Sequence, residues 1–149
     1  MAPPDEPSIG HLFFAPVIPK DAASVIKAQD VFYQAQKDLG LPIPPGFFGM
    51  LPAGWYHRSF IYLMGFSVSS NPEANRRTEE ACRALIQIAA ENGWGEYRTH
   101  ALFQDDVMGV YNFNDNALLR LHETIKDAID PNGILAAGKS GIWPKHLRG

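Results

Sequence analysis

Apolar positions in the first two thirds of the chain change between strand-like and helix-like spacing. A short apolar run at His11–Ile18 is typical of a β-strand. From Asp21 to Leu39 the apolar residues recur at steps of three and four, which predicts a helix with Asp21 as N-cap and Gly40 just past its end. The aromatic and β-branched run at Trp55–Val68 predicts another strand, with Phe47–Leu51 as its neighbour.

Helical periodicity returns twice in the rest of the chain. Asn71-Pro72 favours a helix start, because Asn caps well and Pro fits the first helical position, and Asn92-Gly93 favours its end. A third helix is predicted over Asn116–Ile129, and it stops at Asp130-Pro131-Asn132-Gly133, where Pro cannot continue the hydrogen-bond ladder. This third helix is expected to bury an apolar stripe made of Leu118, Leu121, Ile125 and Ala128.

The order of these elements predicts an α+β fold, in which an antiparallel sheet is covered by the helices Asp21–Leu39 and Asn71–Asn92. The tail from Ala101 to Pro144 is expected to be mainly helical, with extended connections. The Pro- and Gly-rich segment from Pro42 to Gly54 lies inside this pattern, so it does not mark a linker. Residues 1–149 are therefore predicted to form one domain.

Composition excludes several classes of protein. Hydrophobic residues make up 46% of the 149 positions, which is enough for a core and too many for a disordered chain. A net charge of −3 gives no sign of a nucleic-acid or anionic-membrane partner. The single Cys82 excludes an internal disulfide framework. The N-terminus lacks the pattern of a secretory signal and no apolar stretch is long enough to cross a membrane, so we expect a cytoplasmic protein.

One motif suggests a binding site that the rest of the sequence does not support, and the histidines suggest none. Gly133–Ser140 matches the phosphate-loop pattern G-x-x-x-x-G-K-[ST], which works between a strand and a helix. Here a turn precedes the motif and only nine residues follow it, so nucleotide binding is disfavoured. None of the five histidines shows the His-x-x-x-His spacing of a helical metal site, and no metal is predicted.

The segment Gly93–His100 places Tyr97 directly before Arg98, and a phenol beside a guanidinium can hold an anion. Adjacent side chains on a regular strand point to opposite faces. Both groups therefore reach one site only if the backbone is irregular, which the nearby glycines allow. The residues alone leave open the alternative of a surface Arg and a half-buried Tyr.

Three segments resemble the vanillyl-alcohol oxidase family, whose members include eugenol oxidase and 4-cresol dehydrogenase and use FAD to oxidise 4-substituted phenols. These segments are Gly10–Pro16, Asn92–His100 and Asp130–Pro144, in the family's order. The resemblance covers nearly the whole chain and implies a C-terminal, cap-like domain with a ferredoxin-like sandwich. It also implies that Gly133–Ser140 is the family's closing segment.

The resemblance implies cofactor contacts at three residues. His11 matches the histidine that, in the oxidase branch, is bonded covalently to the 8α carbon of the flavin, where the 4-cresol dehydrogenase branch uses a tyrosine. Lys139 matches a lysine beside the flavin pyrimidine edge. Arg98 matches an arginine that also balances negative charge on the reduced flavin. The expected cofactor is therefore FAD, attached through His11 in the complete enzyme.

The resemblance also implies substrate contacts. Tyr97 and Arg98 match the catalytic pair that binds the substrate phenol as phenolate. Phe13 matches an aromatic residue that lines the substrate cavity, and His57 aligns with a histidine near the active centre. The implied reaction is hydride transfer from the benzylic carbon of a vanillyl-alcohol, eugenol or 4-alkylphenol type of substrate to the flavin.

The family enzymes are several times longer than this chain, and the resemblance implies that an N-terminal FAD-binding domain is missing here. We therefore expect the chain to be inactive by itself and to need an FAD-binding domain or chain as partner, and we expect only the complete enzyme to form a homo-oligomer. The alternative is a structural module that has kept the fold without the activity.

Overall fold

A computed structural model describes residues 9–41, 49–51 and 57–148. The chain forms two compact units, residues 1–98 and residues 99–149. Among the described residues, no helix is long and apolar enough to cross a membrane. Parts of two predicted strands, at 47–48 and 55–56, lie outside the described residues.

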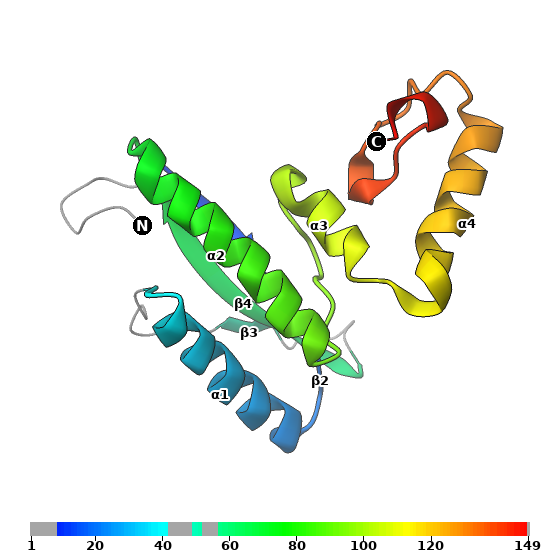
Figure 1. Ribbon diagram of the computed structural model, residues 1–149. Helices are drawn as coiled ribbons and strands as arrows, with labels where there is room; N and C mark the ends of the chain where they lie inside the picture. The colour runs from blue at the N-terminus through cyan, green and yellow to red at the C-terminus, as the bar shows by residue number, and fades with distance from the viewer. Residues whose placement is uncertain (1–8, 42–48, 52–56, 149) are drawn as a thin grey trace. The chain divides into compact units, whose positions relative to one another are not determined.

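The N-terminal unit contains an antiparallel sheet in which β4 pairs with every other strand (Figure 1). Its strands are β1 (Gly10–Phe14), β2 (Val17–Pro19), β3 (Gly49–Leu51) and β4 (Ser59–Val68). β1 and β2 share one register along β4, since Phe14 pairs with Met64 and Val17 pairs with Ile61. The first strand is therefore continuous apart from one interruption at Ala15-Pro16, where Pro16 lacks the N–H that a regular ladder needs.

The sheet continues beyond β1 and β2 on their outer edge. There, Pro16 forms an antiparallel bridge with Glu96. At the other edge of the sheet, β3 pairs with β4. The resulting βαββαβ order, with the last strand reduced to this bridge, is that of a ferredoxin-like unit. The strand predicted at His11–Ile18 is confirmed with one break, and the predicted α+β class is confirmed.

Two helices cover one face of this sheet (Figure 1). They are α1 (Ala22–Asp38) and α2 (Pro72–Glu91), close to the predicted bounds. The Asp21 carboxylate accepts a bond from the Ser24 N–H at 2.8 Å, and Asn71 caps α2 in the same way. Gly40 and Gly93 follow the two helices with φ of +61° and +77°, a conformation that Gly adopts without steric cost.

The core of the N-terminal unit lies between the helices and one face of the sheet. Alternate strand residues point into it, among them Leu12, Phe14, Tyr62, Met64 and Phe66. Phe32 of α1 is fully buried, and its ring lies 5.1 Å from the Tyr62 ring and 5.5 Å from the Trp94 ring. This aromatic cluster joins the helices to the sheet and to the segment that follows α2.

The C-terminal unit consists of short helices and turns. It contains α3 (Gln104–Gly109), α4 (Phe113–Ile129) and the 3₁₀ helices η1 (Ala101–Phe103), η2 (Lys139–Gly141) and η3 (Lys145–Leu147). The regular part of α4 follows a left-handed stretch at Asn114–Asn116, so the predicted start at Asn116 is close to the observed one. The buried Asp130 ends α4: it accepts bonds from the Ile134 and Leu135 N–H groups and from Lys126 at 2.6 Å.

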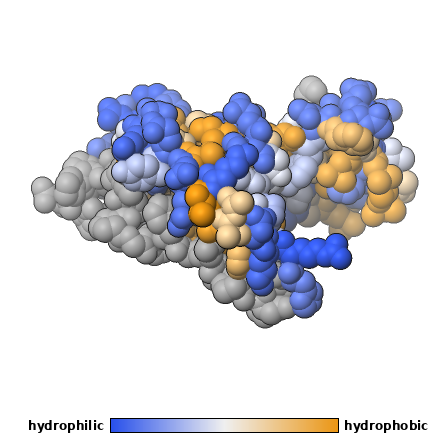
Figure 2. Space-filling view, turned by 90° about the horizontal axis from the view of Figure 1, so that it is seen from below, coloured by the Kyte–Doolittle hydropathy of each residue, from blue (hydrophilic) through white to orange (hydrophobic). Residues whose placement is uncertain are grey.

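The predicted burial of the α4 stripe is wrong. Leu118, Leu121 and Ile125 are 39%, 57% and 47% exposed, and Ala128 is exposed as well (exposed apolar surface is orange in Figure 2). The periodicity correctly indicates an amphipathic helix, but no described element of the C-terminal unit covers its apolar side. Helical spacing fixes which residues share a face and not what that face packs against.

The aromatic cluster at Phe32 predicts a large stability effect. Phe32→Ala should lower the free energy of unfolding by about 3–5 kcal/mol, because it removes a fully buried ring and leaves a cavity. Urea unfolding followed by tryptophan fluorescence measures the change. Tyr33→Ala, at a 45% exposed position on the same helix, is the matched control and should cost less than about 1 kcal/mol. Equal losses in the two variants would contradict the described core.

Candidate functional site

The sheet face opposite the helices carries two of the predicted site residues. His11 and Phe13 alternate with the buried Leu12 and Phe14, so both point to the open face. Their rings are stacked, with centroids 6.2 Å apart and planes 19° from parallel. The face thus presents an imidazole and a phenyl ring next to each other.

A cleft of about 170 Å³ lies beside Phe13 on this face, and both Tyr97 and Arg98 line it. Tyr97 and Arg98, adjacent in the chain, thus both border one cleft, and the backbone bends at both residues. The remaining walls are apolar, and the lining residues are Phe13, Ala15, Ile61, Leu63, Tyr97 and Arg98. A guanidinium and a phenol hydroxyl at the border of apolar walls can hold the oxygen of an aromatic anion while the ring contacts the walls.

The segment that carries Tyr97 and Arg98 is fixed to the interruption in the first strand. The Val17 N–H donates to the Gly95 carbonyl at 2.8 Å, and the Tyr97 N–H donates to the Ala15 carbonyl at 2.9 Å. Just before this segment, Trp94 is buried against Phe32. The cleft is therefore built by pairing between residues about 80 positions apart in the sequence.

Glu96 lies behind the cleft with a largely buried carboxyl group. Its Oε1 accepts a bond from the Ala15 N–H at 2.9 Å. Its Oε2 is buried and has no hydrogen-bond partner among the described residues. Burial raises the pKa of Glu96 to about 7, against the opposing effect of the Ala15 N–H. The sequence analysis did not assign a role to Glu96; its position next to Tyr97 and Arg98 is the only signal there.

Cys82 of α2 is a second buried titratable group behind the cleft, and Glu96 affects its pKa. Burial raises the pKa of the Cys82 thiol to about 12, and the negative charge of Glu96 adds to this effect. The thiol is therefore protonated and inert at neutral pH. It forms part of the packing behind the cleft.

The other two predicted site residues do not line the cleft. His57 is exposed in a bend just before β4. Lys139 is exposed at the start of η2, in the C-terminal unit. The structure thus brings together Phe13, Tyr97 and Arg98, with His11 stacked on Phe13.

The phosphate-loop pattern has neither of the elements that such a loop needs. α4 precedes Gly133, and the three-residue η2 follows Gly138. A Cβ on Gly133 would lie 2.7 Å from Pro144, and one on Gly138 would lie 2.5 Å from the Trp143 ring. These glycines therefore serve close packing against Trp143-Pro144, and not the approach of a phosphate.

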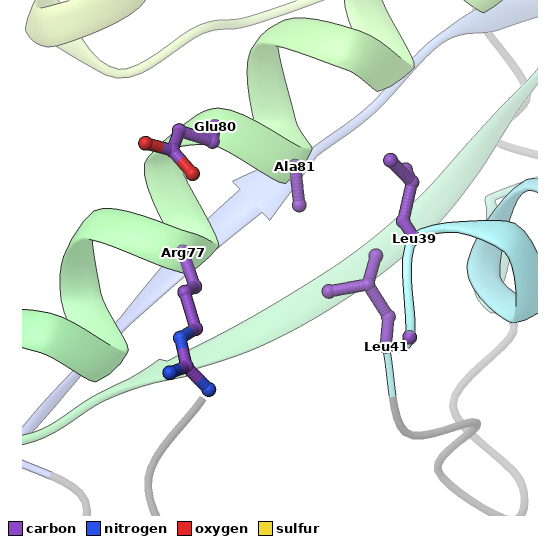
Figure 3. Close-up of a pocket in the computed structure, with 6 residues that line it drawn as sticks. Leu39, Leu41, Arg77, Glu80 and Ala81 are labelled. Atoms are coloured by element: carbon purple, nitrogen blue, oxygen red, sulfur yellow. The ribbon is translucent and has the colours of Figure 1, made fainter.

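A second and larger pocket of about 470 Å³ lies between the end of α1 and α2, lined by Leu39, Gly40, Leu41, Arg77, Glu80 and Ala81 (Figure 3). None of the predicted site residues lines it. Its two charged side chains are engaged elsewhere on α2, where Arg77 pairs with Glu73 and Glu80 pairs with Arg76. We therefore place the candidate site at the cleft on the open sheet face.

Three lining residues were missing from the sequence-based prediction. Ile61 and Leu63 alternate along β4 with Tyr62 and Met64, so period-two spacing could have placed them on the sheet face opposite the helices, where Ile61 is nevertheless fully buried. Ala15 carries no such signal. It reaches the cleft because the strand is interrupted there.

Comparison with known proteins adds independent information. The model of a family described as FAD linked oxidases, C-terminal domain, matches residues 56–140. The 4-cresol dehydrogenase [hydroxylating] flavoprotein subunit of Pseudomonas putida is 37% identical over 73 residues, which make up 49% of this chain and 13% of that protein.

Two solved structures resemble the whole fold. A 4-ethylphenol oxidase from Gulosibacter chungangensis, in complex with isoeugenol, is 36% identical with a TM-score of 0.76 over 95% of this chain. A p-cresol methylhydroxylase with substrate bound is 27% identical with a TM-score of 0.75 over 90% of this chain. The chain spans only 26% and 24% of these two proteins.

The packing behind the cleft predicts the reactivity of Cys82, the single cysteine of the sequence. A pKa of about 12 leaves roughly 10³-fold less thiolate than an ordinary thiol has at mildly alkaline pH. In the folded chain, a disulfide-exchange reagent should therefore fail to label Cys82 during the time in which it labels the urea-unfolded chain completely. Labelling at the same rate in both states would contradict the burial of this side chain.

Proposed function

Because the chain belongs to the family of FAD linked oxidases, C-terminal domain, we propose that it supplies the substrate-binding and flavin-contacting part of an FAD-dependent oxidoreductase. The proposed substrates are 4-substituted phenols, of the vanillyl-alcohol, eugenol or 4-alkylphenol type. The observation that carries this proposal is the cleft that Tyr97 and Arg98 line together with the apolar residues Phe13, Ala15, Ile61 and Leu63. The two similar structures are named as a 4-ethylphenol oxidase and a p-cresol methylhydroxylase. These names support the choice of substrate class.

Tyr97 and Arg98 act on the phenol oxygen in this proposal. The permanent charge of Arg98 favours the phenolate over the phenol, and the Tyr97 hydroxyl donates a hydrogen bond to the same oxygen. Phe13 and Leu63 contact the ring and exclude water from it. Once the phenol oxygen has lost its proton, loss of a hydride from the benzylic carbon gives a neutral quinone methide, to which water can add.

His11, Arg98 and Lys139 are the residues of this chain proposed to hold FAD. The exposed imidazole of His11, stacked on Phe13 at the open face, fits a planar cofactor that a covalent bond can anchor. Arg98 and the exposed Lys139 supply the positive charge that suits a flavin carrying negative charge. FAD, when bound, supplies the two-electron acceptor for the hydride.

An FAD-binding domain or chain is the proposed partner, because this chain spans only about a quarter of the two similar structures. The exposed apolar stripe of α4 is the surface that we propose it covers, since contact with apolar side chains would remove them from water. We further propose that only the complete enzyme forms a homo-oligomer.

The role of Arg98 predicts a ranking of variants. In the complex with an FAD-binding chain, Arg98→Ala should lower kcat for a 4-alkylphenol by about 10²–10³-fold, or about 2.7–4 kcal/mol, because the positive charge that keeps the bound phenol in its reactive, deprotonated form is lost. Arg98→Lys keeps the charge but loses the planar fork, so its loss should be smaller. Tyr97→Phe should lose less than Arg98→Ala, since it removes one hydrogen bond. Wild-type turnover in Arg98→Ala would contradict the proposed role.

The role of His11 predicts where the flavin is attached. After co-expression with an FAD-binding chain, flavin absorbance should remain on this 149-residue chain under denaturing conditions. His11→Ala should release the flavin on denaturation while the native complex still binds it. His146→Ala, at an exposed position in η3, is the control and should keep the covalent bond. A wild-type complex without flavin would favour the alternative, a structural module without activity.

A further inference from the structure

The unexplained feature of the site is that Tyr97 and Arg98, which are adjacent in the chain, both line one cleft. In a regular strand, Tyr97 and Arg98 would point to opposite faces. Residues 95–97 pair with the first strand around one isolated antiparallel bridge. Pro16 and Glu96 face each other in the antiparallel bridge, and the Val17 N–H and the Tyr97 N–H donate across it on either side.

The pairing becomes irregular at Ala15. In a regular antiparallel ladder, Ala15 and Tyr97 would exchange two hydrogen bonds: the Tyr97 N–H would donate to Ala15, and the Ala15 N–H would donate to the Tyr97 carbonyl. Only the first of these bonds follows the ladder, with a length of 2.9 Å. The Ala15 N–H donates to Oε1 of Glu96 instead, also at 2.9 Å.

We infer that Glu96 is a positioning residue for the Tyr97–Arg98 pair, because its carboxyl group takes the acceptor place of the Tyr97 carbonyl. The main chain is thereby released from the sheet edge directly after Tyr97. Arg98 can then turn to the same cleft as Tyr97 instead of the opposite face. This inference rests on the proposed function for what Tyr97 and Arg98 bind. It does not rest on the proposed function for where the two residues lie.

The surroundings of Glu96 agree with a role that uses its carboxyl group. A buried carboxyl oxygen without a partner is costly, and Oε2 of Glu96 is such an atom among the described residues. Burial raises the pKa of Glu96 to about 7, so this cost falls when the carboxyl is protonated. From α2 the titratable Cys82 faces it, and from the first strand only the backbone at Ala15-Pro16 does.

The raised pKa of Glu96 determines in which direction the stability of the folded chain changes with pH. The unfolded chain ionises Glu96 at the ordinary value of 4.5, whereas the folded chain keeps its proton up to about 7. The group therefore favours the folded state fully below pH 4.5, and this contribution is lost as the pH rises to about 7. Glu96→Gln should remove this pH dependence and keep an acceptor for the Ala15 N–H.

Amide hydrogen exchange and pH titration of the isotope-labelled full chain test the inference. In Glu96→Leu, which has no acceptor for the Ala15 N–H, the Ala15 amide should exchange at least about tenfold faster, whereas Glu96→Gln should keep the wild-type rate. Glu91→Leu, at an exposed position on α2, is the matched control and should leave this rate unchanged. In the wild type the Ala15 amide resonance should titrate near pH 7, and in Glu96→Gln it should not.

Unchanged protection of the Ala15 amide in Glu96→Leu would overturn the inference. An Ala15 resonance that ignores the pH in the wild type would overturn it as well, and this second readout still decides if Glu96→Leu does not fold. Neither measurement needs flavin or phenol. An inactive wild-type complex with the expected exchange pattern would therefore count against the proposed function and not against the positioning role of Glu96.

Discussion

The site depends on the interruption of the first strand at Ala15-Pro16. Pro16 accepts a hydrogen bond from the Tyr62 N–H of β4 but has no N–H to return, so the ladder between the two strands is weakened at this point. The backbone groups of Ala15 and Val17 face the opposite edge, and residues 95–97 pair with them there. This contact brings Tyr97 and Arg98 to the strand that carries His11 and Phe13.

Local signals in the sequence were sufficient to predict the elements whose formation depends on residues close together in the chain. Asp21 and Asn71 cap the helices that follow them, and Gly40 and Gly93 adopt the left-handed backbone after those helices. The short apolar run at His11–Ile18 also placed His11 and Phe13 on a strand. In each case the interaction spans a few residues, so spacing and residue type determine it.

Long-range pairing is what local patterns could not predict. The bond between Ala15 and Glu96 joins residues 81 positions apart, and no periodicity in either segment indicates it. The stripe on α4 shows the same limit, because spacing predicted its amphipathic character and failed on its burial. The roles of Tyr97 and Arg98 came from a family resemblance, which the match of the family model over residues 56–140 supports independently.

The central claim is that Tyr97 and Arg98 hold a phenol as its anion. Absorbance titration of 4-nitrophenol bound to the complex of this chain with an FAD-binding chain tests it most directly, because the two ionisation states of this phenol differ in colour. The account predicts that the pKa of the bound phenol lies below that of the free phenol in the wild type, and that Arg98→Ala abolishes this difference. A bound phenol whose pKa equals or exceeds the free value in the wild type would contradict it.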